Sequence, residues 1–207
     1  MLLVLELSPE ITTVLGGLAF VLLSVSQFIY LKDIVKGKLQ PHLLSWIGWS
    51  LLMASSTVSQ WIEIGWEFSL LGMVSSSLGC ALIAITALLT KNYLLILKDM
   101  KFVLAGLTCL GLYFFFQDPW ITTLFAILAD FVLGWPTLVK AYRNPDSERS
   151  NAWNWSWFSW VISFSLSFTD GPIYRLFPLY LLLWCTVILY LTHFKKTNVK
   201  QKLNVNI

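Results

Sequence analysis

Asp130 is the residue whose type and position most clearly predict chemistry. It is a single acid inside an apolar stretch at residues 120–141. About ten residues into a membrane helix, it would lie about 15 Å deep, near the bilayer centre. Burying its charge there costs about 2.5–3.5 kcal/mol on insertion scales, and no Lys, Arg or His stands at a comparable depth. We predict a neutral carboxyl that exchanges a proton when water reaches it, hence a proton-coupling role. The alternative is an acid that only holds helices together by bonding Ser or Thr.

The same stretch carries a helix breaker. Pro136 removes a backbone hydrogen bond and, together with Gly134, predicts a kink. The kink has two interpretations of equal weight. One is a hinge for alternating access, and the other is a static bend.

Five polar or aromatic side chains near mid-depth of other apolar stretches are candidates for a substrate pocket. An amide or hydroxyl inside a span must find a hydrogen-bond partner, and an indole can stack on a ring. The candidates are Gln27, Ser55, Ser76, Ser163 and Trp184. For most serines of these stretches, close packing between helices is the competing interpretation, because small hydroxyls let helices approach and bond across the gap.

Six tryptophans near the basic ends of the apolar stretches predict an aromatic belt. Indoles are enriched at membrane–water interfaces, where one side is apolar and the other wet. A gate over a solute is the alternative. The six are Trp46, Trp49, Trp153, Trp155, Trp157 and Trp160.

No set of residues in the sequence predicts catalysis. There is no nucleophile–base pair, phosphate-binding glycine loop or cluster of metal ligands. Cys80, Cys109 and Cys185 lie inside apolar runs, which is typical of small buried hydrophobic residues. No basic patch alternates with aromatic residues in a polar segment, so nucleic-acid binding is not expected. We expect no enzymatic activity, no cofactor and no metal.

The composition places these residues on membrane-spanning helices. Of the 207 residues, 57% are hydrophobic and 12% are charged, which is about half the charged share of a soluble domain. Lipid offers no hydrogen bonds to the backbone, so each long apolar run is expected to be a helix. The short fourth run and the Ser- and Trp-rich sixth leave six spans as an alternative. The seven predicted spans are 11–31, 42–61, 68–90, 101–117, 120–141, 152–170 and 173–194.

The basic residues predict the orientation. With seven spans, one side carries the loops after the first, third and fifth spans and the carboxy-terminal tail, whereas the other carries Arg175 as its single basic residue. The positive-inside rule then places the amino terminus outside and the carboxy terminus in the cytoplasm, across a plasma (inner) membrane. The first side holds Lys32, Lys36, Lys38, Lys91, Lys98, Lys101, Lys140, Arg143, Arg149, Lys195, Lys196, Lys200 and Lys202.

Short matches whose spacings differ by a single inserted residue predict an internal repeat. ITT stands at 11–13 and at 121–123, an offset of 110. SWIGW at 45–49 and SWFSW at 156–160 match at an offset of 111. The first three spans thus correspond to the last three, with the fourth as a linker that gives both triplets the same orientation. Parallel repeats of this kind place a substrate site at their interface.

This plan resembles the SWEET sugar transporters and the wider PQ-loop family. The family signature is a Pro-Gln pair near the cytoplasmic end of the first and fifth spans. Here the matching pairs are Ser26-Gln27 and Pro136-Thr137, so each half keeps one member. The stretch ADFVLGWPTLVKAYRNP at 129–145 has Asp, Gly and Pro in family-like order. The resemblance implies a carrier for small solutes and places proton coupling on Asp130, whose repeat counterpart is Phe20.

The predicted architecture is an all-α integral membrane protein with seven transmembrane helices in a 3+1+3 parallel-repeat arrangement. Residues 1–90 form the first three-helix repeat, 91–119 the linker helix, 120–194 the second repeat and 195–207 a basic cytoplasmic tail. The predicted function is a small-solute transporter or facilitator for a sugar, an amino acid or a similar polar metabolite. A vitamin or nucleoside carrier stays open, and the alternative from another class is a non-transporting adaptor or sorting receptor. The expected partners are the lipid bilayer and the solute, with a homo-oligomer left open.

Overall fold

The computed structural model describes residues 7–64, 70–116, 118–168 and 172–194. The predicted basic tail at 195–207 lies outside these residues. The described chain is all-α, as predicted, and its β-content is a single bridge between His42 and Leu94. Short 3-10 turns precede α4, α6 and α7, and a π turn, Tyr190–Phe194, extends α7. The seven helices are α1 Pro9–Val35, α2 Leu43–Ile64, α3 Leu70–Thr90, α4 Met100–Phe115, α5 Pro119–Arg143, α6 Ala152–Leu166 and α7 Leu176–Leu189.

Four of these helices are long and apolar enough to cross a membrane. They comprise α1, most of α3 and α5, and α7 with its π turn. The apolar part of α2 is shorter, Leu43–Val58. α4 has 16 residues and α6 has 15, so they extend over about 24 Å and 22 Å, less than the roughly 30 Å of a hydrocarbon core. The fourth and sixth predicted spans, which the sequence left open, thus form two of the three shortest α-helices. α6 ends at Leu166, before residue 170, where the predicted span ended.

α1 and α5 begin with the same local device. Ser8 accepts a hydrogen bond from the Ile11 backbone, and Asp118 accepts from the backbones of Trp120 and Ile121 at 2.9 and 3.0 Å. Each cap is followed by a proline at the first helical position, where its missing N–H costs nothing. Ser8 and Asp118 are 110 positions apart, which is the same offset as that between the two ITT segments.

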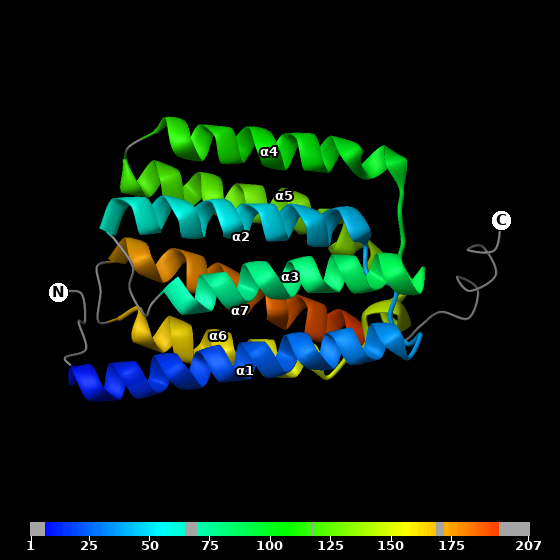
Figure 1. Ribbon diagram of the computed structural model, residues 1–207, viewed down its shortest axis with the longest axis horizontal. Helices are drawn as coiled ribbons and strands as arrows, with labels where there is room; N and C mark the ends of the chain where they lie inside the picture. The colour runs from blue at the N-terminus through cyan, green and yellow to red at the C-terminus, as the bar shows by residue number, and fades with distance from the viewer. Residues whose placement is uncertain (1–6, 65–69, 117, 169–171, 195–207) are drawn as a thin grey trace.

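Successive helices run in opposite directions along a common axis, with α1, α3, α5 and α7 parallel to one another (Figure 1). α3 packs against both α1 and α2, and α7 packs against both α5 and α6. Between these groups, α1 lies on α6 and α2 lies on α5. α4 packs against α5 and α2 at an edge of the bundle (Figure 1). When α1, α2 and α3 are matched with α5, α6 and α7, each contact among these six helices corresponds to another of them.

Serine hydroxyls join the helices, which favours the packing interpretation for most of them. Ser26 donates to the Ala152 carbonyl or bonds Ser156, both at 2.8 Å, linking α1 to α6. Ser159 donates to the Ala19 carbonyl at 2.8 Å across the same contact. Between α2 and α3, Ser50 and Ser77 each donate to the other's carbonyl at 3.2 Å. Such bonds hold apolar helices at close range where lipid gives no hydrophobic drive for association.

Leu133 determines how closely three helices pack against one another. It lies on α5 and fills the space left by two glycines, Gly48 on α2 and Gly106 on α4. A Cβ at Gly48 would stand 2.4 Å from a Leu133 methyl, and one at Gly106 would stand 2.6 Å from the Leu133 Cγ. The absence of a side chain at both positions lets α2 and α4 pack on the same leucine.

We predict that Gly106→Ala lowers the stability of the protein by about 1–3 kcal/mol, because the new methyl group overpacks against Leu133. Gly111→Ala on the same helix is the matched control, since nothing lies within 4 Å of a Cβ there. That change should be neutral or slightly stabilising, because alanine favours a helix over glycine. Thermal unfolding in detergent measures both, and equal midpoints for the two variants would contradict the packing described here.

Candidate functional site

A cavity of about 90 Å³ lies within the bundle, and every helix except α4 contributes to its wall. It is large enough for a few water molecules and smaller than the pockets of roughly 300–1,000 Å³ that hold drug-sized ligands. The wall includes residues from both predicted repeats. They are Leu23, Ser26, Gln27, Tyr30, Trp46, Trp49, Met53, Ser76, Cys80, Ile83, Asp130, Ala152, Trp153, Ser156, Trp160, Leu181, Trp184 and Cys185.

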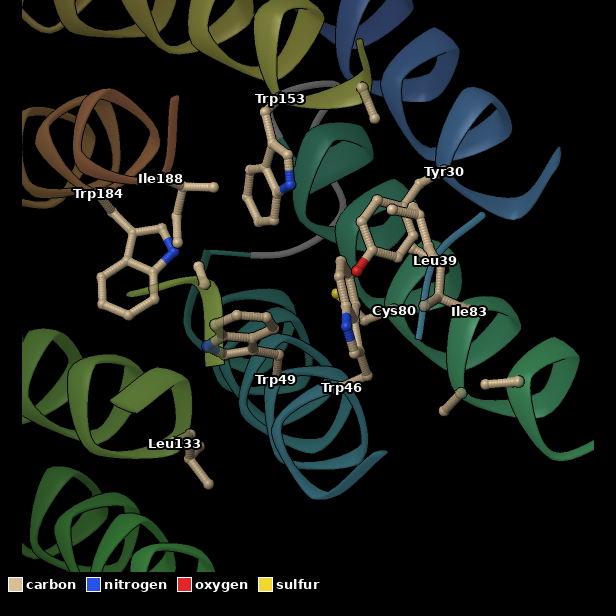
Figure 2. Packing of buried hydrophobic residues seen from close by; sticks show 14 of the residues in the cluster. Tyr30, Leu39, Trp46, Trp49, Cys80, Ile83, Leu133, Trp153, Trp184 and Ile188 are labelled. Atoms are coloured by element: carbon tan, nitrogen blue, oxygen red, sulfur yellow. The ribbon is translucent and has the colours of Figure 1, made fainter. Parts of the chain in front are cut away.

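Aromatic rings form much of this wall. Figure 2 shows Tyr30, Trp46, Trp49, Trp153 and Trp184 grouped around a common space. Neighbouring rings meet mostly edge to face, at centroid distances of 5.1 Å for Trp46 with Trp49 and 6.1 Å for Trp49 with Trp184. This geometry suits the ring quadrupoles and seals the space between the helices.

The predicted aromatic belt is wrong for three of its six members. Trp46, Trp49 and Trp153 are 7%, 6% and 7% exposed, so they face the interior and not the lipid. Trp155 is 40% exposed, as a belt residue would be. The prediction went wrong because position along a helix gives the depth of a residue in the membrane but not the face on which it lies.

Asp130 is buried, with 2% of its surface exposed, and it lines the cavity from α5. The Tyr180 hydroxyl on α7 donates to its Oδ2 at 2.7 Å. The Trp49 indole on α2 donates to its backbone carbonyl at 3.3 Å. No Lys, Arg or His lines the cavity. The arrangement places a carboxyl group in an aromatic cavity whose wall has no basic side chain.

The other predicted pocket residues divide into two groups. Gln27, Ser76 and Trp184 line the cavity together with Asp130. Ser55 and Ser163 do not. Gln27 fits because Gly79 on α3 has no side chain, since a Cβ there would stand 2.0 Å from the Gln27 amide carbon.

Gly134 and Pro136, the predicted hinge, lie within a continuous α5. Both are buried. A Cβ at Gly134 would stand 2.7 Å from the Trp184 ring and 2.7 Å from the Trp49 ring. Gly134 thus gives two cavity indoles the room to pack against α5, whatever its part in a motion.

Tyr180 is the functional residue that the sequence prediction missed. It is the hydrogen-bond donor to Asp130, and it stands four residues before Trp184 on α7. Residues at that spacing share one helix face. A tyrosine one turn from a predicted pocket tryptophan, in an otherwise apolar run, was a usable signal because a buried hydroxyl requires a partner.

A buried ion pair closes the basic end of the bundle. Lys140 at the end of α5 pairs with Glu148 in the turn Pro145–Glu148, and it also donates to the Gln40 carbonyl. The Tyr30 hydroxyl on α1 donates to Glu148 Oε2 at 2.7 Å. The side chain of Glu148 is fully buried. Tyr30 thus connects this ion pair to the cavity, which its ring lines.

The residues after Glu148 form further hydrogen bonds at the same end of the bundle. Arg149 donates to the Thr192 carbonyl at 2.8 Å, beyond α7. Ser150 donates to Asp33 at the end of α1, at 2.7 Å. The loop between α5 and α6 therefore contacts both α1 and the extension of α7.

His42 ties together two further loops at the same end. Its Nε2 lies 3.1 Å from Asp99, just before α4, and its Nδ1 lies 3.2 Å from the Ser45 hydroxyl. Burial lowers the pKa of the His42 imidazole, and the charge of Asp99 opposes part of this shift. His42 precedes α2 and fixes the start of that helix against the segment that leads into α4.

Among the described residues, no three His, Cys, Asp or Glu side chains gather closely enough to hold a metal ion. Cys80 and Cys185 are buried thiols in the cavity wall. The site offers a carboxyl group, hydroxyls, an amide and aromatic rings. These groups can bind a small solute or a proton.

No family model, curated protein or solved structure matches this chain. The functional argument therefore rests on the geometry described above.

We predict that Glu148→Gln destabilises the protein by about 3–5 kcal/mol, because it leaves Lys140 charged and buried without its partner. The double variant Lys140→Met with Glu148→Leu should recover most of that loss, since it removes both charges. The control is Asp146→Asn, which breaks an exposed pair with Arg149 and should cost no more than about 1 kcal/mol. Thermal unfolding in detergent compares the four proteins. A double variant less stable than Glu148→Gln would contradict a desolvation cost.

Proposed function

We propose that this chain is a membrane carrier for a small polar solute, with seven spans in a 3+1+3 arrangement and the solute site in the central cavity. Two three-helix units, within residues 1–90 and 120–194, would move against each other, and α4 would join them. The family proposed is the PQ-loop and SWEET-like carriers. The observation that carries the proposal is Asp130, a buried acid without a basic side chain beside it in a cavity walled by helices of both units.

The pattern of helix contacts supports the two units. α3 packs against α1 and α2, and α7 packs in the same way against α5 and α6. Under this correspondence, the contact of α1 with α6 matches the contact of α5 with α2. The matching caps at Ser8 and Asp118 add a local correspondence. A site at the interface of two parallel repeats is where carriers of this type bind their solute.

The charge distribution supports the orientation. Antiparallel helices bring the described basic residues after α1, after α3 and around the end of α5 to one end of the bundle (Figure 1). The positive-inside rule makes this end cytoplasmic, so the amino terminus lies outside the plasma (inner) membrane. The loop between α5 and α6, with its Lys140–Glu148 pair, then lies on the cytoplasmic side.

Mechanistically, Asp130 would take up a proton when the cavity opens to one side and release it on the other. A charged carboxyl is costly in this apolar surrounding, and a proton or a solute group removes that cost. Opening to the cytoplasm would separate Tyr30, Trp46 and Trp153 and release the loop that Glu148 anchors. The cavity in the present arrangement is small because these rings lie together.

We predict that proteoliposomes containing the protein take up at least one member of a panel of small neutral, zwitterionic and cationic solutes, and that a pH gradient changes the rate by at least fivefold. Asp130→Asn should abolish the effect of the gradient, since the amide cannot exchange a proton. Ser163→Ala, a change at a hydroxyl outside the cavity, serves as the control and should retain it.

Gradient-independent flux that is equal in wild type and Asp130→Asn would refute proton coupling and leave the carrier intact. Absence of flux for the whole panel, with a soluble or membrane protein copurifying in stoichiometric amount, would favour an adaptor or sorting receptor. The small cytoplasmic surface of short loops is the reason that we favour a carrier.

A further inference from the structure

The chemistry of the cavity wall narrows the class of solute. Asp130 is its single acidic side chain, and no basic side chain lines it. An anion would meet a carboxyl group without any compensating positive charge. A cation would meet the carboxyl group of Asp130 and several aromatic rings of the wall, both of which attract positive charge.

The aromatic rings are placed around the acid. Trp49 contacts Asp130 through its indole N–H, and the Trp184 ring lies 6.1 Å from that of Trp49. Tyr180, which holds Oδ2, lies 6.3 Å from the Trp184 ring. A cation bound at the Asp130 carboxyl would therefore lie close to indole rings, and aromatic rings are the groups that recognise organic ammonium ions.

An unsatisfied polar group lies in the same wall. The indole nitrogen of Trp153 is buried and has no hydrogen-bond partner. In Figure 2 this nitrogen faces the space among the five rings. The Trp46 nitrogen is also buried without a partner of good geometry, but the Tyr30 hydroxyl lies close enough to interact with it. An acceptor oxygen on a bound solute would satisfy Trp153 when the rings separate.

We propose that the cavity binds a compact organic ammonium ion carrying a hydroxyl or carbonyl oxygen, and that its positive charge replaces the proton on Asp130. The inference rests on the proposed function and names the solute class of the same site. Binding converts the carboxylic acid to a carboxylate and releases one proton to water, while the cation remains whole. The carrier then exchanges an organic cation for a proton, because one carboxylate cannot hold both.

Other titratable groups near Asp130 do not compete for this role. In the cavity wall and in contact with Asp130 they are thiols and phenols, whose neutral forms dominate near pH 7 at their ordinary pKa values. Lys140 lies further along α5 and is paired with Glu148. Lys101 in the first turn of α4 and Arg143 in the last turn of α5 lie at the basic end of the bundle. His193 lies beyond α7 and bonds the Thr192 hydroxyl. The thiols and phenols are Tyr30, Cys80, Tyr180 and Cys185.

The test is calorimetric titration of the purified full chain in detergent with two probes of the same shape. Choline carries a quaternary ammonium and a hydroxyl, and 3,3-dimethylbutan-1-ol is its uncharged isostere. We expect choline to bind at least tenfold more tightly than the isostere. Its affinity should fall about tenfold for each unit by which the pH is lowered in the range where Asp130 is protonated. Titration in two buffers of different ionisation enthalpy should show up to one proton released per choline bound.

Substitutions show on which side chains the binding of choline depends. Asp130→Asn should abolish both the preference for choline and the proton release, whereas Asp146→Asn, the same change at an exposed acid, should preserve them. The comparison of choline with its uncharged isostere in the wild-type protein tests the site even if Asp130→Asn fails to fold. Trp153→Phe should weaken choline severalfold but leave propyltrimethylammonium, which lacks the oxygen, unchanged.

Equal affinity for choline and its neutral isostere in the wild-type protein would overturn the inference, as would failure to bind choline. So would a preference for choline that survives Asp130→Asn. These outcomes are separable from those of the transport assay. Uptake of a neutral solute without choline binding refutes the cation site and keeps the carrier. Choline binding with proton release but no flux of any solute keeps the cation site and refutes the carrier.

Discussion

A carboxyl group buried among apolar helices is the constraint on which the rest of this structure depends. The Asp130 carboxyl accepts a hydrogen bond from Tyr180 and has no basic side chain beside it in the cavity. In a medium of low dielectric constant its charge is costly, so it must be neutral or find a cation. Apolar packing alone would not place an acid at this point. Its cost is understandable if a proton or a bound solute relieves it during function.

The helices around Asp130 enclose it. Serine bonds and glycine contacts hold α1 to α6 and α2 to α5, and these are the contacts across the two groups of three helices. At the basic end, Lys140 and Glu148 form a pair that carries a high desolvation cost when broken on one side only. Tyr30 bonds this pair and also lines the cavity. Tyr30 thus connects the cavity wall to the loop between α5 and α6.

Much of the fold was predictable because lipid-compatible sequences have few options. Backbone groups without water must bond within a helix, so seven apolar runs gave seven helices with ends near those predicted. The short α4 and α6 were foreseen as the weak spans. Asp130, Gln27, Ser76 and Trp184 were placed in the cavity because polar groups at mid-depth must face the protein interior.

The remaining features of the site depend on which face of each helix packs where. Trp46 and Trp153 stand near helix ends, as belt residues do, and their burial follows from helix rotation, which periodicity in an all-apolar run does not reveal. Ser55 and Ser163 have a similar depth to the cavity residues but lie on other faces. The link from Tyr30 to Glu148 joins residues 118 positions apart, and no local pattern encodes it.

The protonation state of Asp130 is the most direct test of these ideas. Infrared difference spectroscopy of the protein in lipid, between acid and alkaline buffer, detects the carbonyl stretch of a protonated carboxyl, and Asp130→Asn assigns the band. We expect a band in acid that disappears in alkaline buffer and is absent in the variant, which shows that water reaches the buried acid. A spectrum in which the wild type and Asp130→Asn do not differ would contradict a titrating acid at the centre of the bundle.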